Sequence, residues 1–342
     1  MRHRLTRRSF LAGAAAGSAS LFIRTGAVAQ GRAEFAFTQY HNQTADSSLH
    51  KRLVEMWATV RTDTGGKVDT QVFALNNNVA GSDPTALKML MAGEIQFFTL
   101  MGGLLGAAVP VAEVQQVPFA FRSAEHAFQA IDGALGAYLR EEMTAKGIHG
   151  FAVGGFDNGM RQLNMVPRPI TVPADLQGLR IRVPAGKMFE DLFRTFGAEP
   201  VTINSNAIHD ALKTGKADGQ ENPLALIDLF KLYEVTKYVS ITNHMWSGFN
   251  QLAHLPTWRR LPEDIRAVID RNVTTFVKRQ RQDQAAANAK VGADLKARGL
   301  VFNDVDVAPF RRQLSGFYST WKKALGPKCW TLLESASGRT LA

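Results

Sequence analysis

The hydrophobic positions in the first third of the chain change repeatedly between the two-residue period of a strand and the 3.6-residue period of a helix. Phe35 and Phe37 lie on one face of an extended segment, and the apolar residues that follow recur at helical spacing. The order β-α-β-α-β favours parallel strands joined by right-handed crossovers. The five predicted elements cover residues 34–40, 48–62, 67–74, 82–91 and 95–100.

The same alternation returns in the middle of the chain, where strand and helix patterns cover residues 179–183, 186–196, 200–203 and 206–214. Two such units predict an α/β protein with two doubly wound lobes, although no sequence repeat relates them. Between the units we expect helices at 124–131 and 135–146 and a strand at 149–156.

A long helical pattern runs from residue 263 to about residue 298 and ends at Gly299. About 36 residues at 1.5 Å each give a helix of about 54 Å, so we expect it to span both lobes. No Ser/Gly-rich linker separates the lobes, and we therefore expect the chain to cross between them more than once. The expected divisions are residues 32–157 with 247–286 for lobe I and 158–246 with 287–342 for lobe II, with a ligand cleft between the lobes.

The N-terminal residues 1–29 have the three parts of an export signal. The pair Arg7-Arg8 precedes a Gly-containing apolar run, and Ala27 and Ala29 supply the small residues of a cleavage site. The paired arginines are typical of twin-arginine signals. The run is too short and too rich in glycine to span a bilayer of about 30 Å, and no cysteine follows it for a lipid anchor. We expect a protein that is soluble in the periplasm after cleavage.

The composition of the chain argues against several kinds of site and of partner. Of 342 residues, 45% are hydrophobic and 20% charged, which is a globular balance. The single cysteine, Cys329, excludes an intrachain disulfide and a cysteine-based zinc site. The formal charge is +10, but five arginines and no acid lie in the first 30 residues, which leaves +5 for the remainder. We therefore expect no nucleic-acid partner.

No catalytic motif is present: the chain has no G-x-S-x-G, no H-E-x-x-H and no phosphate-binding G-x-x-x-x-G-K-[ST] loop. The close histidine pairs, His41/His50 and His244/His254, fit surface or core positions better than a metal site. We therefore expect no enzymatic activity, no cofactor and no metal.

Three segments, residues 155–162, 179–184 and 218–224, each place polar groups at the end of a strand pattern. In open α/β sheets the ligand crevice lies beyond the carboxyl ends of the strands. Arg182 lies at such an end, and Asn222 is held in an extended conformation by the following proline. The strand period alone leaves open whether Arg182 binds a ligand or forms an ion pair at the surface.

These segments resemble the periplasmic solute-binding proteins of tripartite ATP-independent periplasmic (TRAP) transporters, of the C4-dicarboxylate-binding type. The resemblance extends from about Phe35 to the long final helix. Its most specific parts are L-Q-G-L-R-I-R-V-P at 176–184, G-A-E-P-V at 197–201, D-G-Q-E-N-P at 218–223, F-K-L-Y-E-V at 230–235 and T-N-H at 242–244.

The resemblance implies a Venus-flytrap receptor that captures an organic acid and delivers it to a TRAP membrane permease, and we expect it to act as a monomer. It assigns the ligand carboxylate to Arg182, with Asn222 close by. It adds a second contact from Arg161. The remaining pocket walls that it implies are His41 and Asn42, in the 40–43 loop, together with Trp246 and Phe249.

Two alternatives remain open at this point: an exported periplasmic enzyme that carries a cofactor, and a ligand-sensing module that docks on a membrane receptor. The ligand itself also remains open among dicarboxylates, sugar acids, keto acids and aromatic acids.

Overall fold

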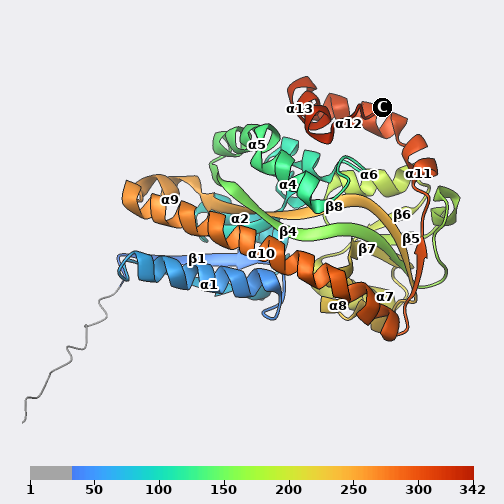
Figure 1. The fold of residues 1–342 in the computed structure, drawn as a ribbon, viewed down its shortest axis with the longest axis horizontal. Coiled ribbons are helices and arrows are strands. Elements are labelled where there is room, and N and C mark those ends of the chain that lie inside the picture. The colour runs from blue at the N-terminus through green and yellow to red at the C-terminus, as the bar shows by residue number, and fades with distance from the viewer. Residues whose placement is uncertain (1–32) are drawn as a thin grey trace, which may run out of the picture. The chain divides into compact units, whose positions relative to one another are not determined.

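One mixed sheet organises residues 33–342, the part of the chain that the computed structural model describes (Figure 1). The predicted export signal lies outside these residues. The strand order is β2-β1-β3-β8-β4-β7-β5-β6, and β9 pairs with β8. The strands are β1 (Phe35–His41), β2 (Val68–Phe73), β3 (Phe97–Met101), β4 (Ile148–Met165), β5 (Arg180–Val183), β6 (Glu199–Thr202), β7 (Gly219–Pro223), β8 (Tyr238–His254) and β9 (Val301–Asp304).

Two long antiparallel strands, β4 and β8, join the two halves of this sheet. On one side, β1 pairs in parallel with β2 and β3, and on the other β5 pairs in parallel with β6 and β7. The two predicted α/β units are therefore confirmed, and the chain crosses between them through β4 and β8. The predicted strand at 149–156 is only the first half of β4, and the sequence pattern did not reveal β8.

Helices cover the sheet and lie close to their predicted ranges where a prediction was made. The helices are α1 (Ser48–Asp63), α2 (Asp83–Ala92), α3 (Gly102–Leu105), α4 (Ala124–Asp132), α5 (Ala134–Ala145), α6 (Lys187–Thr195), α7 (Ile208–Lys213), α8 (Leu224–Leu229), α9 (Leu255–Arg260), α10 (Glu263–Ala297), α11 (Ala308–Arg312), α12 (Ser315–Leu325) and α13 (Pro327–Ser337). Short 3-10 segments cover Ala74–Asn78, Pro110–Gln116, Pro173–Leu176, Ser205–Ala207 and Leu232–Glu234.

The long helix α10 contacts both halves, as predicted (Figure 1). It has 35 residues, packs against α1 at one end and approaches α8 at the other, where Arg298 pairs with Asp228 at 2.9 Å. Between these contacts the side-chain amide of Gln280 accepts a hydrogen bond from the backbone N–H of Asp157 and donates one to its carbonyl oxygen, both at 2.8 Å. Asp157 borders a register shift in β4, so this amide holds the strand where its pairing is interrupted.

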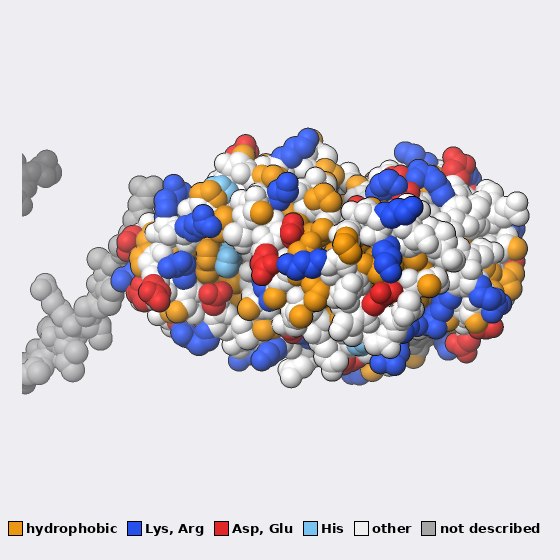
Figure 2. Space-filling model, turned by 90° about the horizontal axis from the view of Figure 1, so that it is seen from above, with side chains coloured by type: hydrophobic (Ala, Val, Ile, Leu, Met, Phe, Trp, Pro, Cys, Tyr) orange, Lys and Arg blue, Asp and Glu red, His pale blue; other side chains and the backbone are white. Residues whose placement is uncertain are grey.

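The surface of residues 33–342 carries acidic and basic side chains that are interspersed over the face drawn in Figure 2. No helix among these residues is long and apolar enough to cross a membrane.

A buried glutamate, Glu113, connects the segment after β3 with the helix after β5. Its Oε2 accepts the backbone N–H of Met188, in the first turn of α6, at 2.8 Å. Burial raises the pKa of Glu113 to about 7, although the Met188 N–H opposes that rise; on α6, Asp191 and Glu190 raise the pKa further and Lys187 lowers it.

Between about pH 4.5 and 7 the folded chain therefore retains a proton on Glu113 that the unfolded chain releases, so this group makes stability fall as the pH rises. We expect Glu113→Gln to keep the hydrogen bond through its amide oxygen and to flatten this part of the pH profile. At pH 8 the free energy of unfolding should be higher than in the wild type by up to about 3 kcal/mol. Urea unfolding at pH 5, 6, 7 and 8 measures the effect, with the exposed Glu94→Gln as control. An unchanged pH profile would contradict the assignment.

Candidate functional site

A cavity that is partly open to solvent lies where the carboxyl ends of β1, β5 and β7 approach one another. Both halves of the sheet contribute to its wall. Its polar lining residues are Asn42, Gln43, Asp83, Asn158, Arg161, Arg182, Asn204, Ser205 and Asn222. Its apolar lining residues are Met101, Leu104, Pro184, Ala185, Ile208, Leu226, Phe230 and Phe249.

Among residues 33–342, Arg182 is a buried cation that has no paired anion. It lies at the end of β5 and is only 3% exposed. Its Nε and Nη2 donate to the carbonyl oxygen of Ile203 at 2.8 and 2.5 Å, whereas its Nη1 donates to no residue that the structure describes. Within 33–342 no carboxylate oxygen comes within 4.0 Å of the guanidinium. Burial lowers the pKa of Arg182 to about 9, against the more distant influence of Glu221 and Asp83.

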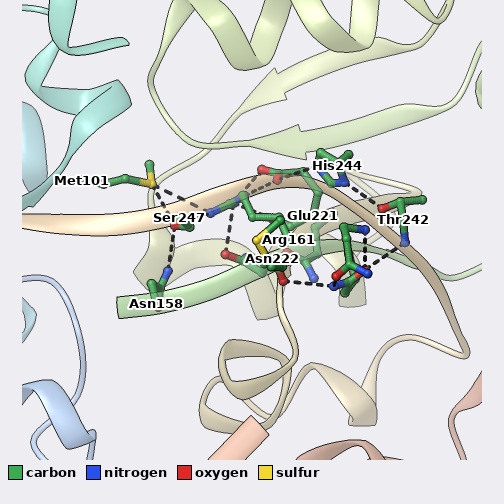
Figure 3. A network of polar contacts seen from close by, with 12 residues as sticks. Met101, Asn158, Arg161, Glu221, Asn222, Thr242, His244 and Ser247 are labelled. Carbon is green, nitrogen blue, oxygen red and sulfur yellow. Dashed lines mark hydrogen bonds and ion pairs between the residues drawn. The ribbon is translucent and has the colours of Figure 1, made fainter. Parts of the chain in front are cut away.

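The second arginine, Arg161, is already bound by the protein (Figure 3). Its Nε contacts Oε2 of Glu221, and its Nη2 donates to Oε1 and to the backbone oxygen of Glu221 at 2.6 and 2.7 Å. Nη1 donates to Oγ of Ser247 at 3.1 Å, and Nη2 also reaches Oδ1 of Asn222 at 3.2 Å. Arg161 lines the cavity, but Glu221 balances its charge.

Glu221 is fully buried at the centre of this network. Burial by itself would raise the pKa of Glu221, but the charge of Arg161, with help from His244, holds it below the ordinary value. Nε2 of His244 lies 3.3 Å from Oε2 of Glu221, and Nδ1 of His244 lies 2.8 Å from Oγ1 of Thr242 (Figure 3). The network therefore joins β4, β7 and β8 beneath the cavity.

Side-chain amides complete the polar wall. Nδ2 of Asn222 donates to Oε1 of Gln220 at 2.5 Å, which fixes the amide of Asn222 at the end of β7. On the other side, Nε2 of Gln43 donates to Oδ1 of Asn158, and Nδ2 of Asn158 donates to Oγ of Ser247, both at 3.0 Å.

Asp83 is the acid of this wall, and sequence reasoning identified it only as part of a helix start. It is the first residue of α2 and is 4% exposed. Its Oδ2 accepts from Nδ2 of Asn42 at 2.8 Å, and its Oδ1 accepts from Nδ2 of Asn76 at 2.7 Å. Burial raises the pKa of Asp83 above its ordinary value, although these two amides and the charge of Arg182 oppose the rise.

Of the predicted site residues, the structure brings five together in the cavity wall: Arg182, Arg161, Asn222, Asn42 and Phe249. The other two predicted wall residues, Trp246 and His41, lie outside the lining, so the prediction that they line the pocket is wrong.

Trp246 faces away from the cavity because side chains alternate along β8. Its neighbour Ser247 contacts Arg161, whereas the indole N–H of Trp246 donates to Oδ1 of Asp157 at 3.0 Å. The indole ring packs edge-on against Phe121 and Phe128. Trp246 therefore belongs to the core.

His41 is the last residue of β1, directly before the lining residues Asn42 and Gln43. Its Nδ1 accepts the backbone N–H of Gln43 at 3.2 Å, and its Nε2 lies 2.9 Å from Nδ1 of His50 in α1. Burial lowers the pKa of His41 to about 3, so the ring is neutral and positions the loop. No group of three or more metal-binding side chains lies together in the described part of the chain.

A family model, described as bacterial extracellular solute-binding protein, family 7, matches residues 40–324. Among similar proteins, a solute-binding protein of Roseobacter denitrificans is 30% identical over 271 residues, which are 79% of this chain and 82% of that protein. The protein y4mM of Sinorhizobium fredii is 34% identical over 268 residues; these are 78% of this chain but only about half, 49%, of the longer relative.

Solved structures of solute-binding proteins are also similar to this chain. A TRAP periplasmic solute-binding protein from Polaromonas sp. JS666, bound to D-erythronate, is 26% identical with a TM-score of 0.83, over 90% of this chain and 100% of that one. One from Roseobacter denitrificans, bound to β-D-glucuronate, is 24% identical with a TM-score of 0.84, over 89% of this chain and 100% of that one, and shows the shared fold. With the family model matching most of its length, the chain belongs to the family 7 of bacterial extracellular solute-binding proteins.

Proposed function

We propose that this chain is a non-catalytic periplasmic receptor that binds the carboxylate of an organic acid at Arg182 and delivers the acid to a TRAP membrane permease. The observation that carries the proposal is the buried guanidinium of Arg182, which lines the cavity and has no ion-pair partner among residues 33–342. A guanidinium presents parallel N–H groups that match the two oxygens of a carboxylate.

Burial of a lone cation is unfavourable, because the charge loses its hydration. A carboxylate bound at Arg182 offsets this cost only when the cavity is enclosed. The ligand therefore stabilises the enclosed state more than an open one, and this difference is what a ligand needs to shift a conformational equilibrium.

The wall is built from both halves of the sheet, which supports closure around the ligand. We assign lobe I to residues 32–157 with 247–286 and lobe II to 158–246 with 287–342. Arg182, Arg161 and Asn222 then come from lobe II, whereas Asn42, Asp83 and Phe249 come from lobe I.

The ligands named for the two solved structures, D-erythronate and β-D-glucuronate, each carry one carboxylate. They support an organic acid as the ligand class. The carboxylate of Glu221 is occupied with internal hydrogen bonds and holds Arg161 in place. This favours a structural role over an acid–base role for Glu221.

A thermal-shift screen of carboxylic acids, each paired with its neutral methyl ester, tests the proposal. A ligand at 100 times its dissociation constant stabilises the folded chain by about 2.7 kcal/mol, which corresponds to roughly 4 °C for a protein of this size. We expect at least one acid to raise the melting temperature by this amount and its ester to have little effect. Equal shifts for acids and esters, or no shift with any acid, would refute the carboxylate receptor.

A further inference from the structure

We infer that the cavity selects acids with one carboxylate and several hydroxyl groups and disfavours dicarboxylates, and that Asp83 sets this preference. The inference rests on the proposed function, in which Arg182 holds the ligand carboxylate. It follows from the charges and hydrogen-bonding groups of the cavity wall.

The charges of the wall leave a place for one carboxylate. Two arginines line the cavity, but Glu221 neutralises Arg161 through both carboxylate oxygens. Arg182 is thus the one lining cation, within the described residues, that has no carboxylate within 4.0 Å. A ligand with a second carboxylate would find no further unpaired cation in this wall.

Asp83 opposes a second carboxylate and attracts hydroxyl groups. Amide NH2 groups only donate hydrogen bonds, so Asn42 and Asn76 hold both oxygens of Asp83 as acceptors. Each oxygen retains a further lone pair, and no cationic nitrogen of residues 33–342 lies within 4.0 Å of it. An acceptor in the wall suits a ligand O–H donor, whereas a carboxylate beside it would bring two like charges together in a partly desolvated site.

The other polar groups of the wall suit the same ligand. Five lining side chains are amides and one is a hydroxyl, and these groups both donate and accept, as ligand hydroxyls do. Phe230 and Phe249 add apolar surface for the C–H groups of a polyhydroxy chain or ring. The five amides are Asn42, Gln43, Asn158, Asn204 and Asn222, and the hydroxyl is Ser205.

The test compares acids that differ in one terminal group. D-Erythronate and meso-tartrate differ only in whether the last carbon is an alcohol or a carboxylate, and D-gluconate and D-glucarate form the same pair with six carbons. Butyrate lacks all hydroxyls. By titration calorimetry at pH 7.5, we expect the hydroxy monocarboxylate of at least one pair to bind about ten-fold or more tightly than its dicarboxylate and than butyrate.

The variant Asp83→Asn keeps the shape and removes the negative charge. It should reduce the preference for the monocarboxylate over the dicarboxylate at least about ten-fold. The control Asp69→Asn lies in the same half, at an exposed position paired with Arg61, and should leave the preference unchanged. If Asp83→Asn does not fold, the ligand pairs with the wild-type protein still test the selectivity.

The outcomes separate the two proposals. Dicarboxylates that bind as tightly as their hydroxy partners, or an unchanged preference in a folded Asp83→Asn protein, would overturn the inference and leave the carboxylate receptor intact. If no acid of the panel binds and the wider screen of acids also fails, the proposed function fails, and this inference fails with it.

Discussion

Replacement of Arg182 by alanine is expected to weaken binding of the preferred acid by about 2–5 kcal/mol, or roughly 30-fold to several thousand-fold. The variant removes the one lining cation that has no carboxylate partner in residues 33–342, so the ligand carboxylate would enter the cavity unpaired. The chain should still fold, because the side chain of Arg182 makes only the two hydrogen bonds to Ile203 and no ion pair with a described residue.

Two further variants of β5 distinguish a specific clamp from a general charge effect. Arg182→Lys should also bind poorly, because an ammonium group cannot form the paired hydrogen bonds of a guanidinium. Arg180→Ala is the matched control: Arg180 lies two residues earlier on the same strand, its side chain is 41% exposed, and it pairs with Asp218 outside the cavity. Calorimetry on the three proteins measures the losses, and circular dichroism confirms folding. Similar losses for Arg180→Ala and Arg182→Ala would show a diffuse electrostatic effect and contradict the clamp.

Much of the fold was predictable because the elements of the two α/β units bury one face each. The predicted strand at 34–40 and helix at 48–62 differ from β1 and α1 by one residue at their ends. The long predicted helix agrees with α10 to within one residue, since its apolar positions recur over many turns. The rule that ligands bind at the carboxyl ends of strands predicts a site at Arg182 and Asn222, and both residues line the cavity.

The strand β8 could not be predicted, because most of its polar residues are as buried as its apolar ones. Ser240, His244 and Ser247 interrupt the hydrophobic pattern, and partners from distant parts of the chain satisfy their side chains. A pattern of buried and exposed positions records only the contact with water. It carries no information about a polar side chain that exchanges water for another buried polar group.

The same limit explains why Trp246 was wrongly predicted to line the cavity and why Asp83 was not predicted as part of its wall. Trp246 and Phe249 both lie in β8. Because the sequence pattern did not reveal β8, the alternation of side chains between its two faces could not be used to separate these residues. Asp83 resembled an ordinary residue of a helix start, and its partner Asn76 lies in a segment with positive φ angles at residues 75–78. Asparagine tolerates that left-handed backbone better than most residues, which is the one local signal the sequence offers there.

The central pair of Arg161 and Glu221 leads to the second large effect. Both side chains are almost completely buried, at 2% and 0% exposure. We expect Glu221→Gln to lower the free energy of unfolding by about 3–5 kcal/mol, because it leaves Arg161 as an unpaired buried charge. Urea unfolding at pH 7.5 measures the loss. The matched control is Asp69→Asn, which breaks the exposed pair with Arg61 and should cost less than about 1 kcal/mol.

A second replacement tests whether the loss arises from the charge rather than from altered packing. The double variant Arg161→Met/Glu221→Gln also removes the cation that loses its partner in Glu221→Gln, so we expect the double variant to be more stable than Glu221→Gln alone, even though it carries one more substitution in the core. Loss of packing alone would make the double variant the less stable of the two.

The double variant also tests which arginine binds the ligand, because it keeps Arg182. If Arg182 alone holds the ligand carboxylate, the double variant should bind the acid more tightly than Arg182→Ala does. Equal binding losses in these two proteins would show that Arg161 shares the carboxylate.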